Sequence, residues 1–367
     1  MQPTETHSSP SPDPILQMAT GFWASKTLMS AVELEVFTKV SGKSLSLNDF
    51  QKLLGFEIRP AEVFVTALVS LGLLEVTKGS DGKENEGFYS NSELADTFLV
   101  RGKPSYIGDF ITMLDKRLYK SSDRLPQSLK SNRPAVETIG QEGNRSIDAL
   151  YSHALSNEEA QDDVMRIFTH AMYGVSLGPA MALPKVFDFS NYRKMMDIGG
   201  GPGVYPIQVV REFPNMSAVV IDSKPVCQIA AQYIKQSNLQ DKIHTKPLDF
   251  LKEELPKECD AAFLSHILHG LSVEKDKILL KKVYDSLVPN ENNNSVILIS
   301  EWLLNDEKTG PVPSAMMSLN MILEMNEGRN YSFAEICNML SGVGFENIER
   351  RALAGPAEIV IGYKINK

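Results

Sequence analysis

A glycine-rich stretch in the second half of the chain could bind a ligand through its backbone. Residues 195–198 read MetMetAspIle, and residues 197–203 read AspIleGlyGlyGlyProGly. Glycines at such a turn allow close approach to the main chain and leave the amide N–H groups accessible. Asp197, at the end of the apolar run, can bond a cationic or hydroxyl-bearing group. The stretch therefore predicts a ligand site between a strand and a helix.

Two cofactor classes compete for this loop. The dinucleotide fingerprint GxGxxG needs a last glycine where this chain has Val204 or Pro206, depending on which glycine begins the pattern. The DxGxGxG pattern used for S-adenosylmethionine is satisfied in full. Its residues are Asp197, Gly199, Gly201 and Gly203. We therefore expect S-adenosylmethionine rather than a dinucleotide.

Acidic residues follow the next two strand-like segments. Asp222 comes directly after residues 217–221 and could accept hydrogen bonds from both hydroxyls of a ribose. Asp249 follows an expected strand at 243–246 and could accept the exocyclic amine of adenine, while Phe250 covers the ring face. Each aspartate alone is typical of a cap or a turn. Three in register at successive strand ends support a nucleoside site.

Two histidines in the segment 265–272, SerHisIleLeuHisGlyLeuSer, could act as a base. A phenol has an ordinary pKa of about 10, so methyl transfer to it at neutral pH benefits from a base, and histidine is the usual one. His266 and His269 have helical spacing, which does not decide between them. A metal pair would need a third ligand, and none is obvious, so we expect no metal.

Glu301 follows an apolar strand-like segment, 295–299. In a parallel sheet its side chain would lie at the same edge as the glycine loop. The carboxylate could orient a histidine by accepting its second ring N–H, as in hydrolase triads. A solvated carboxylate at a strand end is the alternative interpretation.

The elements that would position these residues alternate from about Val186 onward. Expected strands are 195–198, 217–221, 243–246, 260–264, 295–299 and 358–363, and expected helices are 205–213, 226–236, 274–287 and a late helix that Ser332 and Glu335 cap and that ends near Gly342. This rhythm predicts a parallel sheet covered by helices on both faces. The last strand is compatible with an antiparallel direction.

The first half is mostly helical. Apolar spacing predicts a helix from Ile15, a second at 46–54 with Asp49 three residues after a capping Ser46, and a third at 60–71 ended by Gly72. Strands at 73–76 and 88–90, joined by a polar loop, complete the order of a winged helix. Residues 105–182 predict further helices, whose methionines and aromatic residues suit a core or the wall of an apolar pocket.

Composition narrows the functional classes. The 367 residues suffice for two domains, and the net charge of −9 with no basic stripe disfavours nucleic-acid and membrane partners. Three distant cysteines fit a reducing, cytoplasmic location. The polar, proline-rich residues 1–14 predict a disordered tail, and the apolar excess at 15–37 favours burial against a partner chain.

Together these motifs resemble the class I small-molecule O-methyltransferases, which include plant caffeate and flavonoid enzymes and bacterial polyketide and pigment enzymes. The resemblance spans nearly the whole chain. The matching stretches outside the cofactor motifs are residues 21–28 and 33–37 (dimerisation helix), 70–75 (winged-helix junction), 168–172 (pocket helix), and 318–321 with 342–348 (C-terminal region). The family's LeuHisAspTrp motif falls on LeuHisGlyLeu, 268–271.

The resemblance implies a role for each matching residue. His269 would be the general base, Glu301 would hold it, and Asn330 would complete the hydrogen-bonded set. Ser265 falls where the family often places a cofactor-contacting residue. The implied acceptor pocket contains Phe168, Met172, Met317 and Asn320.

This chain departs from the family at two positions. Gly270 replaces the Asp after the base, and residues 327–332, GluGlyArgAsnTyrSer, place Asn330 where the family has a second acid. An amide accepts hydrogen bonds but brings no charge to stabilise an imidazolium. Two alternatives stay open: another chemistry in the same cofactor pocket (a decarboxylase, hydroxylase or pericyclase), and a winged-helix regulator that uses the fold as a sensor.

The expected fold is an α/β, Rossmann-like S-adenosylmethionine-dependent methyltransferase domain behind a mostly helical, winged-helix dimerisation domain. The expected boundaries are 1–14 for the tail, 15–115 for the dimerisation domain, 116–182 for linking and pocket helices, and 183–367 for the methyltransferase domain. The expected activity is methyl transfer to a hydroxyl of a small, aromatic or conjugated acceptor by a homodimer.

Overall fold

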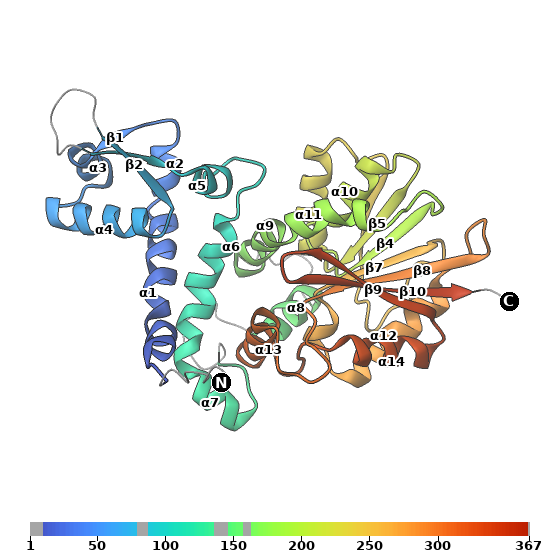
Figure 1. The fold of residues 1–367 in the computed structure, drawn as a ribbon. Helices are drawn as coiled ribbons and strands as arrows, with labels where there is room; N and C mark the ends of the chain where they lie inside the picture. The colour runs from blue at the N-terminus through green and yellow to red at the C-terminus, as the bar shows by residue number, and fades with distance from the viewer. Residues whose placement is uncertain (1–9, 79–86, 136–145, 157–162, 366–367) are drawn as a thin grey trace, which may run out of the picture. The chain divides into compact units, whose positions relative to one another are not determined.

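The computed structural model describes residues 10–78, 87–135, 146–156 and 163–365 (Figure 1). Most of the tail expected at 1–14 lies outside the described residues, and the chain is already helical from Asp13. The loop expected between residues 77 and 88 lies largely outside them as well. Two compact units can be distinguished, Met1–Asp115 and Lys116–Lys367.

The first unit has the predicted order of elements. Its helices are α1 (Asp13–Glu33), α2 (Val36–Val40), α3 (Leu47–Leu54), α4 (Ile58–Ser70), α5 (Glu93–Phe98) and α6 (Gly108–Met113), and its strands are β1 (Leu45–Ser46), β2 (Leu74–Lys78) and β3 (Gly87–Asn91). Among the described residues the strands form an antiparallel sheet in the order β1-β3-β2. The sequence did not predict β1 or α5.

Local signals set the ends of the helices in this unit. Ser46 accepts from the backbone N–H of Asp49, whose carboxylate accepts from Ser46 in return, so the predicted capping box begins α3. Gly72 takes a φ of +68° just after α4, which explains why that helix stops there.

The second unit is built on a mixed sheet. Its strands are β4 (Lys194–Ile198), β5 (Ser217–Asp222), β6 (Ile243–Pro247), β7 (Ala261–Ser265), β8 (Asn294–Glu301), β9 (Glu346–Ala354) and β10 (Ala357–Ile365). In the described part of the chain they form one sheet in the order β6-β5-β4-β7-β8-β10-β9. The neighbouring strands β6, β5, β4, β7 and β8 run parallel to one another. Strand β10 is antiparallel to both β8 and β9. Only β9 was not predicted, because its sequence is largely polar.

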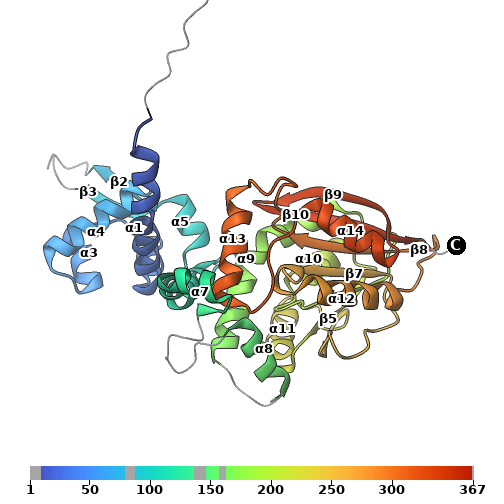
Figure 2. The same ribbon diagram turned by 90° about the horizontal axis from the view of Figure 1, so that it is seen from below.

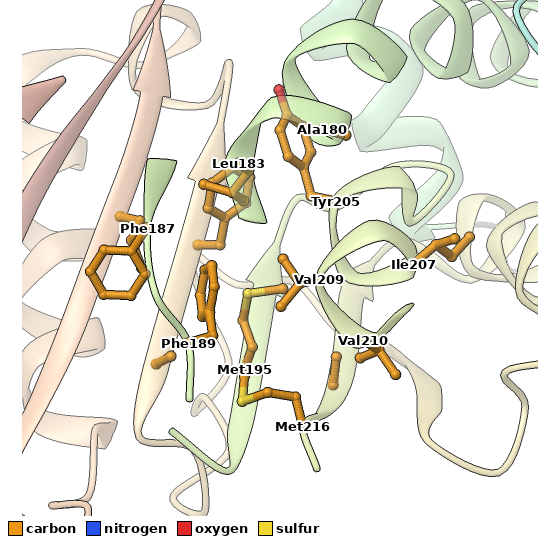
Figure 3. Close-up of a cluster of buried hydrophobic side chains, with 14 of the residues drawn as sticks. Ala180, Leu183, Phe187, Phe189, Met195, Tyr205, Ile207, Val209, Val210 and Met216 are labelled. Atoms are coloured by element: carbon orange, nitrogen blue, oxygen red, sulfur yellow. The ribbon is translucent and has the colours of Figure 1, made fainter. Parts of the chain in front are cut away.

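Helices cover both faces of this sheet, as predicted (Figure 1). On one face lie α9 (Asp163–Val186), α10 (Val204–Glu212) and α11 (Lys224–Gln236), and on the other lie α12 (Val273–Ser286) and α14 (Phe333–Val343). Figure 2 shows the same layers from below. Figure 3 shows Leu183 of α9 above the Phe189 ring, which lies beside Met195 of β4, the strand that precedes the glycine loop.

The described residues of this unit also form the helices α7 (Leu125–Ser131), α8 (Ile147–Ser156) and α13 (Val312–Glu324). A π-helical turn spans Leu114–Tyr119. The sequence did not predict α13. In the described residues no helix combines the length and apolarity that crossing a membrane requires.

Candidate functional site

The predicted site residues meet at one edge of the sheet. The chain leaves β4 toward β5 and β6 on one side and later returns to β7 and β8 on the other, so β4 and β7 border a topological switch point. Open α/β sheets bind ligands in the crevice outside the carboxyl ends of such strands. Those ends carry the glycine loop, Asp222, Asp249, Ser265 and Glu301.

The loop after β4 needs glycine at several positions. Gly199, Gly201 and Gly203 have φ angles of +65°, +52° and +75°, a region that other residues rarely adopt. At Gly200 an added Cβ would lie 2.5 Å from a carboxylate oxygen of Asp197. The loop is fixed to the sheet because the N–H of Gly199 donates to the carbonyl of Ile221 at 2.8 Å.

Asp197 is a buried acid that lacks a protein partner. Its side chain is 1% exposed, and among the described residues neither carboxylate oxygen has a hydrogen-bond partner. Burial, together with the nearby charge of Asp222, holds the pKa of Asp197 well above its usual range. A buried polar group without a partner is costly unless a ligand supplies one. Asp197 therefore fits a ligand that brings hydrogen-bond donors to the loop.

Asp222 braces the same loop. One oxygen accepts from the N–H of Gly201 at 3.0 Å and the other from the N–H of Ser223 at 2.7 Å. Burial raises the pKa of Asp222 to about 6, although these backbone bonds oppose the rise. Each carboxylate oxygen can accept a further hydrogen bond, so the predicted ribose contact remains compatible with the bracing.

Phe250 and Asp249, the two residues predicted to contact adenine, have different surroundings. Phe250 lies beside the loop, with a ring carbon 3.7 Å from the Cβ position of Gly199. The Asp249 carboxylate accepts from the N–H of Leu251 at 3.1 Å and pairs with Lys252 at 2.9 Å. Asp249 thus acts locally as a turn cap and an ion-pair partner, and it keeps acceptor capacity at this edge.

Sequence reasoning did not single out Tyr151 as a residue near the donor site. Burial, and next the charge of Asp222, raise the pKa of Tyr151 well above its usual value. Phe168, expected in the acceptor pocket, packs in a cluster with Tyr151, Met165 and Val226 at the beginning of α11. Both residues therefore lie on the Asp222 side of the edge. The aromatic stripe was visible in the sequence, but nothing placed α8 against α11.

The two histidines lie at a tight turn after β7. Residues Leu268–Gly270 form a single 3-10 turn, and His266 precedes it with a φ of +56°. The backbone N–H of His266 donates to the carbonyl of Ser300 at 3.0 Å. The ring centroids of His266 and His269 are 5.1 Å apart.

Glu301 lies against His269, as predicted. Oε2 of Glu301 is 2.7 Å from Nδ1 of His269, although the ring N–H is poorly aligned for a hydrogen bond. Oε1 of Glu301 accepts a hydrogen bond from the backbone N–H of His269 at 3.3 Å. Catalytic hydrogen bonds are often poorly aligned before substrate binds. Burial raises the pKa of Glu301, but the charge and hydrogen bonds of His269 outweigh it, so that this pKa lies below its ordinary value.

The expectation that a metal would find no third ligand was wrong. Ligating atoms of His266, His269 and Glu301 all lie within 4.8 Å of one another. Nδ1 of His266 is 3.7 Å from the same Oε2 of Glu301 that faces His269. The three side chains form one buried cluster, and any divalent cation there would compete with the base role of His269.

Asn330 supports the cluster indirectly. Its Nδ2 donates to the carbonyl of Trp302 at 2.7 Å, and its backbone N–H donates to the hydroxyl of Ser318 on α13 at 3.2 Å. No hydrogen bond joins Asn330 to His269 in the part of the chain that the structure describes, and its Oδ1 is enclosed without a partner there. Asn330 thus tethers the residue after Glu301 to α13.

Two glycines lie in tight contact at the histidine turn, Gly270 within it and Gly328 from the segment 327–332. An added Cβ at Gly270 would lie 2.8 Å from the methyl carbon of Met325, which occupies the space beside the turn. At Gly328, with φ of +100°, a Cβ would collide with the carbonyl oxygen of His269. The segment 327–332 therefore packs directly on the histidine turn.

The remaining predicted residues lie around this turn. The Ser265 hydroxyl donates to the Tyr205 hydroxyl at 3.1 Å. Met317 and Asn320 are half-buried on α13, which packs against the Leu268–Gly270 turn, and Met172 is half-buried on α9.

Comparisons with known proteins agree with this arrangement. The family model of the O-methyltransferase domain matches residues 139–346, and that of the O-methyltransferase dimerisation domain matches residues 16–101. The chain is 30% identical over 353 residues to the tetracenomycin polyketide synthesis 8-O-methyl transferase TcmO of Streptomyces glaucescens, which covers 96% of this chain and 97% of that protein. It is also 30% identical over 361 residues to the 3-hydroxy-5-methyl-1-naphthoate 3-O-methyltransferase of Streptomyces sahachiroi, with coverages of 96% and 95%.

A solved structure shows the same fold. The crystal structure of human N-acetylserotonin methyltransferase in complex with SAM matches with a TM-score of 0.84 at 23% identity, over 99% of this chain and 100% of that chain.

Proposed function

The chain belongs to the O-methyltransferase family, and on that premise we propose that it moves a methyl group from S-adenosylmethionine to a hydroxyl of a small aromatic acceptor, with His269 as the general base. The observation that carries the proposal is the buried pair of His269 and Glu301, located at the same sheet edge as the glycine loop. The printed names of two relatives, a polyketide and a naphthoate O-methyltransferase, support an aromatic acceptor.

The residues around the loop fit the methyl donor. Asp197 brings a carboxylate that lacks a protein partner, Asp222 has free acceptor capacity, and the glycines expose the backbone. Phe250 is placed beside the loop to cover an aromatic base. Tyr151 and Phe168 would close the Asp222 side. When bound, S-adenosylmethionine supplies a methyl group on a positively charged sulfur.

His269 and Glu301 would handle the proton. With Nδ1 facing the carboxylate, the neutral imidazole carries its proton on Nδ1 and keeps a lone pair on Nε2. Nε2 would accept the proton of the acceptor hydroxyl. Because the pKa of Glu301 is below its ordinary value, its carboxylate stays charged at neutral pH and stabilises the imidazolium that forms.

The acceptor would lie between the histidine turn and α13. Met317 and Met325 offer soft, polarisable surface that suits aromatic rings, and Asn320 offers a polar contact. Met172 on α9 would add to the wall, as proposed from the family. We assign Asn330 the role of a positioning residue, because it fixes the main chain next to Glu301 instead of bonding His269.

The first unit would join two copies of the chain. The first part of α1 exposes a row of large apolar side chains, a feature typical of an interface. These residues are Ile15, Leu16, Met18, Phe22 and Trp23, each at least 51% exposed. The dimerisation-domain match covers the same helix, which supports a homodimer. Light scattering should report twice the chain mass, and Trp23→Lys with Phe22→Lys should shift the population toward the monomer.

The activity test uses methyl-labelled S-adenosylmethionine and a panel of phenols. The wild-type protein should label at least one phenol on oxygen. His269→Ala should lower turnover by about 10²–10⁴-fold, the usual size of a general-base contribution, with nearly unchanged binding of adenosylhomocysteine. His153→Ala on α8, outside the cluster, is the matched control. Wild-type turnover in His269→Ala would remove this residue from the chemistry.

A further inference from the structure

His266 is a partly buried residue that the proposed chemistry does not use. Its φ of +56° is uncommon for a residue with a side chain, and such backbone strain persists only where the surroundings impose it, often at functional sites. Here the bond to the Ser300 carbonyl imposes it. The ring packs edge-to-face on Trp302, with centroids 5.9 Å apart, and its side chain is 20% exposed.

The neighbours of the ring determine which nitrogen can accept a hydrogen bond. Nδ1 of His266 is enclosed and faces Oε2 of Glu301 at 3.7 Å. A carboxylate favours the proton on the facing nitrogen, so Nε2 carries the lone pair on the other side of the ring. Burial, and next the proximity of His269, lower the pKa of His266 to about 4. The ring is therefore neutral at physiological pH, and Nε2 is an acceptor.

His269 has the same arrangement relative to the same carboxylate oxygen. Its Nδ1 faces Oε2 of Glu301, and the two ring centroids are only 5.1 Å apart. Two imidazoles thus turn their Nδ1 atoms toward one carboxylate and their Nε2 atoms away from it. Because the two rings are this close, a ligand that contacts the His269 ring would also be near the His266 ring.

We propose that His266 binds a second hydroxyl of the acceptor, ortho or meta to the hydroxyl that is methylated, so that the protein selects aromatic diols with hydroxyls this close together. The proposal rests on the function assigned above. A carbonyl or ether oxygen has no proton to donate to Nε2, which is why the second group must be a hydroxyl. A site that presents a hydrogen-bond acceptor to its ligand discriminates against a ligand that lacks the matching donor.

Four simple acceptors test this selectivity: phenol, catechol, resorcinol and hydroquinone, each with S-adenosylmethionine and the full-length protein. We expect kcat/KM per hydroxyl to be about tenfold higher for catechol or resorcinol than for phenol, the contribution of one net hydrogen bond. Hydroquinone should behave like phenol, because its second hydroxyl lies across the ring.

Two variants assign the preference to the side chain. His266→Phe keeps a ring without an acceptor and should bring the diol-to-phenol ratio close to one. His266→Asn tolerates the left-handed backbone, keeps a carbonyl acceptor and should retain part of the ratio. His244→Asn, an exposed histidine on β6, should leave the ratio as in the wild type. All assays are repeated with EDTA.

The outcomes separate this inference from the assigned function. Equal kcat/KM values for phenol, catechol and resorcinol would overturn the role of His266 and leave the methyltransferase assignment intact. A diol preference that EDTA abolishes would also overturn it, because a cation held by the His266, His269 and Glu301 cluster would then bind the second oxygen. Absence of transfer to every phenol, with adenosylhomocysteine still bound, would overturn both.

Discussion

Replacing Glu301 by glutamine should impair proton removal without disturbing the donor site. In the structure Oε2 of Glu301 is 2.7 Å from Nδ1 of His269, and both side chains are almost fully buried. An amide there removes the charge that stabilises the imidazolium, and its NH₂ group can force the proton of His269 onto Nε2, which is the wrong tautomer for a base.

The size of the effect follows from the contact. A buried, charge-assisted hydrogen bond contributes about 2–3 kcal/mol, which corresponds to roughly 30–150-fold in kcat. Inversion of the tautomer adds to this loss, so about 30-fold is the lower limit.

The assay compares kcat profiles over pH for the wild type, Glu301→Gln and Glu327→Gln, with labelled methyl donor and the best acceptor of the panel. Glu327 is a half-exposed acid that pairs with Lys275, so its variant controls for charge removal near the site. A Glu301→Gln variant that keeps wild-type kcat across the pH range would refute the assignment of His269 and Glu301 as a catalytic pair.

Three further predictions address the donor site and the buried acids. Asp222→Asn should weaken adenosylhomocysteine binding by about 10–100-fold in calorimetry, because it removes a charged acceptor that also braces the glycine loop; unchanged affinity would exclude Asp222 from the site. Gly199→Ala should weaken the same binding by at least about fivefold, since φ is +65° and the added Cβ meets a neighbouring side chain, whereas Gly42→Ala, equally left-handed but in the first unit with open space, should bind normally. Burial raises the pKa of Asp276 to about 8, so the folded state holds this proton more tightly than the unfolded state, and stability from this group is lost as pH rises from about 4 to 8. Asp276→Asn, which can still accept the 2.8 Å bond from Tyr331, should therefore show a smaller fall in Tm over that range; identical profiles for both proteins would contradict the shift.

Much of the second unit could be predicted because its sequence signals are local. Short apolar runs followed by Gly, Asp or Ser mark β4, β5, β7 and β8, and parallel strands bring those following residues to one edge whatever the loops do. The meeting of Asp197, Asp222 and Glu301 was therefore accessible from spacing and topology alone.

Features that depend on packing between distant segments could not be predicted from the sequence. The unpredicted strand β9 is polar and half-exposed, so it lacks an apolar signature, and β1 is only two residues long. The spacing of His266 and His269 did not show which of them faces Glu301, because the left-handed residue and the 3-10 turn go with the main-chain bond to β8. That bond depends on the position of Ser300 in space, which the local sequence does not reveal.

The role of Asn330 illustrates the same limit. Its place in the motif implied a partner for His269, yet its amide donates to the carbonyl of Trp302. The side chain of Met325 fills the space beside Gly270, an arrangement that requires the end of α13 to reach the histidine turn. Residue type indicated which groups matter, whereas their partners depended on the folded backbone.

The most direct measurement is a crystal structure of the protein with adenosylhomocysteine. The proposed function predicts its density in the crevice beyond β4 and β5, against Gly199–Gly203 and within hydrogen-bonding distance of Asp222, with its sulfur on the side of His269. A nucleoside bound elsewhere, or a crevice that stays free of it at saturating concentration, would contradict the assignment.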